Sequence, residues 1–304
     1  MKSKEDWPIL NFNELQGTLE TLHQWFQIVG KIRLKTMPWQ NHSWHTTLYI
    51  TAYGFSTNAI PYKGRTFQLD FDFLQHKLFI QCSDNESLSM ELRPRTVADF
   101  YAELFDKLAS MAIDVKIQGS PNEIEPAIPF AENTTNKTYD PKAANAIWRA
   151  MLKANGVFNK FRSEFIGKCS PVHLFWGAFD LAVTRFSGNM APLYQGTVPN
   201  MSLKVMQEAY SQEVSSAGFW LGSKEFPTPV FYSYAYPSDA HFGAQSVAPK
   251  EAFYSPEMGE FLLKYEDAQK SENPENRVID FLQSTYEAAV NTSKWDRIKL
   301  EKHS

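Results

Sequence analysis

Cysteine is scarce in this chain, with Cys82 and Cys169 the only two among 304 residues. Two thiols cannot form a disulfide framework or a cysteine-based zinc site. Charge of one sign is not in excess either, because 30 Lys and Arg residues stand against 34 Asp and Glu residues and leave a net charge of −4. This balance excludes a protein that binds nucleic acid through a dominant basic surface.

Long hydrophobic runs are also missing. The longest stretch without Asp, Glu, Lys or Arg is 36–62, and its Asn41, His42 and several threonines make it too polar to span a membrane. Residues 1–7 are charged, and no apolar segment of the kind found in signal peptides follows them. We therefore expect a soluble cytoplasmic protein that has neither a membrane nor nucleic acid as a partner.

Aromatic residues, by contrast, are abundant, with 23 Phe, 13 Tyr and 8 Trp. A chain of this length buries about three quarters of its unfolded surface. Aromatic side chains contribute more buried area per residue than most others. The composition therefore predicts a large, aromatic-rich core.

Apolar residues spaced three and four apart predict helices, and alternating apolar and polar residues predict strands. We expect helices over residues 13–34, 96–111, 141–156, 158–165, 203–214 and 274–289. We expect strands over residues 45–53, 67–73, 78–82, 88–92, 171–177, 179–186, 218–221 and 230–236. The short polar turns between strands favour antiparallel pairing. The predicted fold class is α+β, with mainly antiparallel sheets and helices packed on their faces.

Residues 119–141 contain four prolines and no clear periodicity. A stretch of this length without regular structure is uncommon in a compact domain unless it is a lid, a linker or a functional loop. We interpret it as a proline-rich seam that joins two possible halves, 1–120 and 140–304. We expect the halves to be intimately associated, so that 1–304 forms a single compact unit.

Histidines are the first candidates for chemistry. His42 and His45 lie three residues apart, but the expected strand places them on opposite faces, so we predict no metal site. His45, on the Thr and Tyr face, is a candidate for proton transfer. His173 follows Cys169 by four residues and is a second candidate, whereas the thiol itself fits a small core group. No motif indicates a cofactor.

Arg185 is the most informative charged residue. It shares its expected strand face with Leu181 and Val183, and this face should belong to the core. A buried guanidinium needs an anionic partner. Three possibilities remain open at this point: Glu213, Asp99 or an anion of a ligand.

Glu213 and Lys168 are further charged candidates. Glu213 is expected on the 203–214 helix, three residues after Tyr210, at the border of the core, where a carboxylate can act as an acid or a base. Lys168 follows Gly167, but Arg162 occupies the position five residues before that glycine, where a phosphate-binding loop needs a second glycine. Lys168 therefore stays a candidate for binding an anion outside any such loop.

Other ligand-binding candidates are polar residues on otherwise apolar elements. His23 and Lys31 lie on the narrow polar seam of the first helix. Asn41 opens the segment that contains the two neighbouring histidines. Tyr232 and Tyr234 share one face of an expected strand, where they either line an amphipathic pocket or pack at a sheet edge.

Several long segments resemble a bacterial protein family of unknown function. They read GKCSPVHLFWGAFDLAVTRFSG at 167–188, EAYSQEVSSAGFWLG at 208–222 and FYSYAYP at 231–237. The resemblance covers nearly the whole chain and implies no reaction, cofactor or catalytic residue. It implies serine in place of Cys169, which argues against a required thiol. It also implies histidine in place of Gln212, which argues against a metal site that combines that histidine with Glu213.

Two hypotheses of different classes follow. In the first, the protein is an enzyme or sensor that acts on a small anionic molecule in a pocket between the halves. Arg185 and Lys168 would supply charge, His45 and His173 would transfer protons, and the tyrosines would form a wall. In the second, it is a non-catalytic interaction protein whose polar clusters only order the aromatic core. The hypotheses differ in whether these residues converge on a solvent-reachable cavity.

Overall fold

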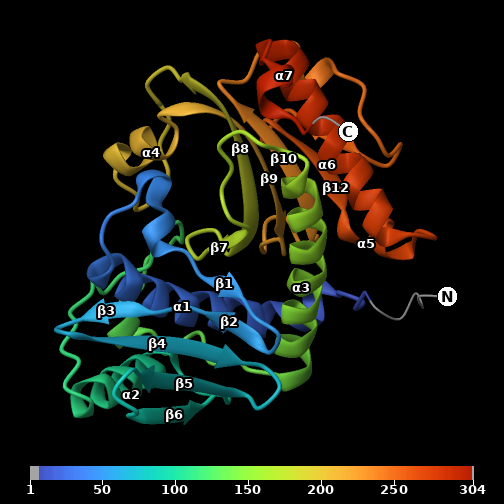
Figure 1. Ribbon diagram of the computed structural model, residues 1–304. Coiled ribbons are helices and arrows are strands. Elements are labelled where there is room, and N and C mark those ends of the chain that lie inside the picture. The colour runs from blue at the N-terminus through green and yellow to red at the C-terminus, as the bar shows by residue number, and fades with distance from the viewer. Residues whose placement is uncertain (1–6, 303–304) are drawn as a thin grey trace.

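The structure, a computed structural model, describes residues 7–302 (Figure 1). Within that range it contains two antiparallel sheets of six strands each, with helices packed against them, which confirms the predicted α+β class. The first sheet has the order β1-β2-β4-β5-β6, with β3 paired to β4. The second has the order β11-β12-β10-β9-β8-β7.

The strands of the first sheet are β1 (Tyr49–Ile50), β2 (Gly54–Ser56), β3 (Ile60–Tyr62), β4 (Arg65–Asp72), β5 (Lys77–Cys82) and β6 (Ser87–Glu91). Those of the second are β7 (His173–Phe175), β8 (Asp180–Met190), β9 (Gln212–Trp220), β10 (Val230–Tyr236), β11 (Phe253–Ser255) and β12 (Glu260–Lys264). The α-helices are α1 (Phe12–Thr36), α2 (Val97–Ser110), α3 (Pro141–Ser163), α4 (Leu203–Ala209), α5 (Tyr265–Lys270), α6 (Pro274–Ser293) and α7 (Arg297–Leu300). Short 3-10 helices are η2 (Asn41–Thr46), η3 (Phe130–Glu132) and η4 (Phe242–Ala244).

The first sheet and α1 form one aromatic core. Alternation along β4 buries Phe71, whose ring stacks on that of Phe26 from α1 at 4.3 Å between centroids. On another side of α1, Trp25 stacks on Phe100 of α2 at 4.6 Å. Because α1 packs against the sheet, α2 and α3, nearly all of its faces are buried, as its apolar sequence predicts.

The second sheet has two faces with different roles. Helices α3 and α6 cover one face, which carries Leu181, Val183 and Arg185 of β8. The alternate residues of β8, including Asp180 and Ala182, face the opposite side and line a cavity. This alternation places the candidate site on the face away from α3 and α6.

The predicted stop near Gly156 is wrong. Helix α3 continues to Ser163, because Val157, Phe158 and Phe161 extend its buried stripe. Glycine is unfavourable inside a helix by about 1 kcal/mol, which the burial of these side chains offsets. In Figure 1, α3 runs past α1 and the first sheet at one end and alongside the second sheet at the other.

The predicted strand over 45–53 is wrong in its first part. His42 and Ser43 adopt left-handed backbone conformations, with φ of 56° and 58°, and the chain turns there as η2. Thr46 reinforces the turn by donating its hydroxyl to the Ser43 carbonyl at 2.9 Å. His42 and His45 therefore lie in one turn and not on opposite faces of a strand.

The helix predicted over 203–214 also ends early. Helix α4 stops at Ala209, and β9 begins at Gln212 and pairs with β8 and β10 on its two sides. Pairing on both sides outweighs the helical spacing of the sequence. Glu213 consequently lies on a strand.

Residues 7–302 contain no helix that combines the length and the apolar character needed to cross a membrane.

Candidate functional site

A cavity of about 1260 Å³ lies where elements from both halves of the sequence meet. Its floor is the open face of β8, β9, β10 and the start of β12. Its walls are the end of α1, η2, residues 118–127 at the start of the proline-rich seam, and residues 194–210, which include α4. The size suits a small organic molecule.

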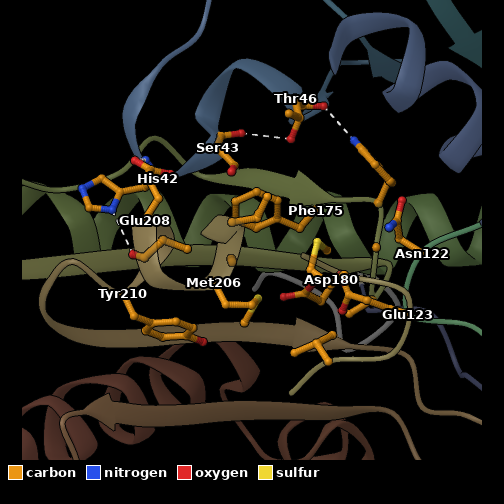
Figure 2. Close-up of a pocket in the computed structure, with 18 of the residues that line it drawn as sticks. His42, Ser43, Thr46, Asn122, Glu123, Phe175, Asp180, Met206, Glu208 and Tyr210 are labelled. Carbon is orange, nitrogen blue, oxygen red and sulfur yellow. Dashed lines mark hydrogen bonds between the residues drawn. The ribbon is translucent and has the colours of Figure 1, made fainter. Parts of the chain in front are cut away.

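Three carboxyl groups form one end of this cavity, which we call the acid end: Glu123, Asp180 and Glu260. Figure 2 shows Glu123 and Asp180 together, with Asn122 beside them, whereas His42 and Glu208 lie at the far end. Asp180 accepts a hydrogen bond from the phenol of Tyr232. The structure records no hydrogen bond or ion pair of the Glu123 and Glu260 carboxylates with any residue it describes.

Burial perturbs the pKa of each of these acids. It raises the pKa of Asp180 to about 6, although the Tyr232 hydrogen bond opposes the shift. It raises the pKa of Glu123 and of Glu260 to about 7, with the neighbouring Asp180 charge adding to the shift in both. Near neutral pH the acid end therefore holds both protonated and ionised carboxyl groups.

Gly177 makes room for one of these carboxylates. It lies in the turn before β8, and a methyl group built on its Cα would stand 1.9 Å from Oε1 of Glu123. The backbone of Glu123 is fixed independently, because its N–H donates to the Pro199 carbonyl at 3.0 Å and its φ is 58°. The position of Glu123 thus depends on a glycine at 177.

Lys31 enters the cavity next to the acid end. Its side chain is 3% exposed, and Nζ donates to Oε1 of Gln118 at 3.2 Å and to Oδ1 of Asn122. The ammonium lies 5.5 Å from the centre of the Trp176 ring. Burial lowers the pKa of Lys31 to about 8, because its polar partners in the described chain are neutral amides.

The opposite end is built around His42. Its ring Nδ1–H donates to the Ala209 carbonyl at 2.9 Å, and Nε2 accepts from Nζ of Lys168 at 2.6 Å. Its backbone N–H donates to Glu208 at 2.6 Å. Burial lowers the pKa of His42, with the Lys168 charge adding to the shift. A neutral His42 thus ties η2 to the end of α4.

Of the predicted site residues, the structure brings four to the cavity: Lys31, His45, Tyr232 and Tyr234. Tyr234 donates to or accepts from Tyr210 through a hydroxyl–hydroxyl contact of 2.9 Å. Burial lowers the pKa of His45. These residues come from α1, η2 and β10, so the cavity joins distant parts of the sequence.

Three predicted residues lie near the cavity without lining it. Nε2 of His23 donates to the carbonyls of Trp176 and Gly177 at 3.0 and 2.7 Å, and burial lowers its pKa to about 4. His23 therefore holds the turn that Glu123 packs against. Lys168 contacts His42 and Gln212. Asn41 is exposed and does not line the cavity.

Arg185 lies on the face covered by α3 and α6, away from the cavity. It is 1% exposed, so the predicted burial is confirmed. Its guanidinium donates to the Phe161 carbonyl and lies 3.4 and 4.3 Å from the ring centres of Phe161 and Tyr286. No ion pair with a carboxylate forms within residues 7–302, so the expected acidic partner is wrong, because aromatic rings surround the cation instead.

His173 and Glu213 are also placed away from the cavity. His173 is fully buried, Nδ1–H donates to the Pro171 carbonyl at 2.6 Å, and Nε2 has no hydrogen-bond partner among the residues that the structure describes. Burial lowers its pKa to about 4, so the ring stays neutral near pH 7. Glu213 accepts from Ser187 at 2.7 Å and Asn189 at 3.2 Å on β8.

Sequence reasoning missed the acid end. Only Asp180 carried a recognisable pattern, an acid on the strand face opposite Leu181 and Val183. Glu123 lies in a seam without periodicity, and the β11–β12 hairpin that positions Glu260 was not expected. No local pattern marks the last two residues as neighbours of Asp180.

The fold and cavity define an α+β protein with a pocket of ligand size on the open face of its second sheet. The chain belongs to the family of unknown function DUF5996, whose model matches residues 7–302. This confirms the resemblance to an uncharacterised family. No curated protein and no solved structure matches the chain.

Proposed function

We propose that this protein is a cytoplasmic enzyme or sensor that binds a small anionic organic molecule in the cavity between its halves. The observation that carries the proposal is Lys31, a buried ammonium that faces the cavity and whose hydrogen bonds within residues 7–302 go to neutral amide oxygens alone. A carboxylate or phosphate of a ligand would supply the missing opposite charge.

The acid end favours an enzyme over a sensor. Carboxyl groups with a pKa between about 6 and 7 can donate or accept protons at neutral pH. Such perturbed groups in a cleft are typical of catalytic sites. The reaction class that this supports is proton transfer to or from the bound molecule.

The alternative, a non-catalytic interaction protein, accounts for Arg185 and His173, whose contacts only order the core. It does not account for the acid end or Lys31, which face open space. Free cysteines at 82 and 169 support the cytoplasmic location.

A thermal-shift screen of small carboxylates and phosphates tests the proposal. Wild type is compared with Lys31→Met and with Lys35→Met, a control on the same helix whose side chain is exposed. A true ligand at 100 times its Kd should stabilise wild type and Lys35→Met by about 2.7 kcal/mol. It should not stabilise Lys31→Met. Equal stabilisation of all three proteins, or none by any anion, would overturn the proposal.

A further inference from the structure

We propose that the acid end of the cavity binds a protonated amine, so that the ligand carries an ammonium close to its acidic group. The evidence for the ammonium comes from Asp180, Glu123, Glu260 and the surrounding aromatic rings. The acidic group of the ligand rests on the function proposed above.

The first argument is the missing countercharge. Asp180 is 9% exposed, and its side-chain partner, Tyr232, is a neutral phenol. No Lys, Arg or His within residues 7–302 forms an ion pair with Asp180, Glu123 or Glu260, and Lys31 binds amides instead. Buried carboxylates are normally paired with a cation, so an external cation would complete this end.

The second argument is the aromatic lining. Trp220 is the direct cross-strand partner of Asp180 and lines the cavity on the same side. Tyr232 and Tyr234, stacked at 6.2 Å between ring centres, continue this wall. Aromatic faces attract ammonium groups, so the wall and the carboxylates favour the same kind of ligand group.

A metal ion fits these carboxylates less well. Within the described chain, the one group of three acidic or thiol ligands close enough to share an ion is Cys82, Asp84 and Glu86. That group is on a hairpin of the first sheet, and Arg65 already pairs with both of its carboxylates. Glu123, Asp180 and Glu260 are spaced too widely for one metal, whereas an ammonium donates hydrogen bonds in several directions.

Lys31 is linked to the acid end through two consecutive residues of the chain. Asn122 accepts from Lys31, and the next residue, Glu123, contributes its carboxylate to the acid end. Figure 2 shows Asn122, Glu123 and Asp180 at the same end of the cavity. An ammonium and an acidic group close together, as in an amino acid or its derivative, match this arrangement. The remaining cavity, with Phe175 and Met206 between its ends, suits an apolar body.

The raised pKa values add a consequence for pH. An ammonium binds the ionised carboxylates, so binding should release protons from Glu123, Asp180 and Glu260. The affinity for an amine should therefore rise from about pH 6 to about pH 8. This signature distinguishes the acid end from a purely apolar pocket.

The test uses two matched probe series with the full chain: phenylalanine, phenethylamine and 3-phenylpropanoate, then tryptophan, tryptamine and indole-3-propanoate. Each series keeps one body and varies the amine and the acid. Calorimetric titration compares wild type with Glu123→Gln, Asp180→Asn and Lys31→Met. Glu257→Gln is the matched control, because Glu257 is exposed and does not line the cavity.

We expect the amine-bearing probes to bind wild type and Glu257→Gln, and to bind Glu123→Gln or Asp180→Asn at least about tenfold more weakly. The amine-only probes should still bind Lys31→Met. One outcome is that the acid-only probes bind wild type but not Lys31→Met, and that adding an amine to the probe does not raise its affinity. This outcome overturns the amine site and leaves the proposed function standing. If amine-only probes bind through Glu123 and acid-only probes do not bind, the amine site stands and the proposed function fails. No binding of any probe at millimolar concentration overturns the amine site.

Discussion

The phenol of Tyr232 on β10 reaches across β9 to donate a hydrogen bond to the carboxylate of Asp180 on β8. It crosses over Gly218, its direct cross-strand partner, where a methyl group would stand 2.3 Å from the phenol oxygen and 2.5 Å from the Leu181 carbonyl. A residue without a side chain at the centre of the sheet thus brings the phenol to the acid.

Asp180→Asn should stabilise the ligand-free protein at pH 8 more than at pH 5. The folded-state pKa of Asp180, about 6, lies above its ordinary value of 3.8, so the stability gained from its protonated form is lost as pH rises through 6. Removing the charge should therefore gain about 1–3 kcal/mol at pH 8 and roughly half of that near pH 5, where the unfolded chain is already ionised at Asp180 but the folded protein is not. Urea unfolding at both pH values measures this, and an equal effect at both would contradict the assigned pKa.

Gly177→Ala and Gly218→Ala should lower the free energy of unfolding by different amounts. At 177 the added methyl group meets the flexible end of Glu123, which can move, so we expect a loss below ~1 kcal/mol together with weaker amine binding. At 218 it meets the Tyr232 ring and a backbone carbonyl, so we expect a loss above ~2 kcal/mol. Gly156→Ala, in open space on α3, is the control and should stabilise by roughly 0.5–1 kcal/mol. Equal losses at 177 and 218 would show that Glu123 is held rigidly.

Arg185→Met should be tolerated far better than Arg185→Ala. Methionine keeps most of the buried volume and removes a cation that pairs with no carboxylate of residues 7–302, so the free energy of unfolding should change by less than ~1 kcal/mol. Alanine leaves a cavity among Phe161, Phe165 and Tyr286 and should cost about 2–5 kcal/mol. Chemical denaturation compares the two variants. A Met variant as unstable as the Ala variant would mean that the charge itself is required.

The two halves should unfold in one transition. Helix α3 packs against α1 in the first half and against β8, β9 and α6 in the second, and Leu48 bridges to Leu174 between the sheets. Far-ultraviolet circular dichroism and tryptophan fluorescence should therefore give coincident unfolding curves. Two separated midpoints would instead indicate that the halves are independent domains.

The sequence by itself determined the elements with strong periodicity. The apolar stripe of α1, the alternation of β4 and the Thr96–Asp99 cap of α2 each report on neighbours only a few residues away. Such local patterns show which face of an element is buried, and they were sufficient for the α+β class and for the burial of Arg185.

Only the tertiary structure decided which buried faces meet. The turn at His42 depends on contacts with α4, and the extent of β9 depends on pairing with both neighbouring strands. Glu123, Asp180 and Glu260 come from a loop and two strands far apart in the chain, and each carboxyl group acquires its pKa from burial that only the packed sheet and seam create. Local periodicity has no access to that environment, because the desolvation of a charge depends on long-range packing around it.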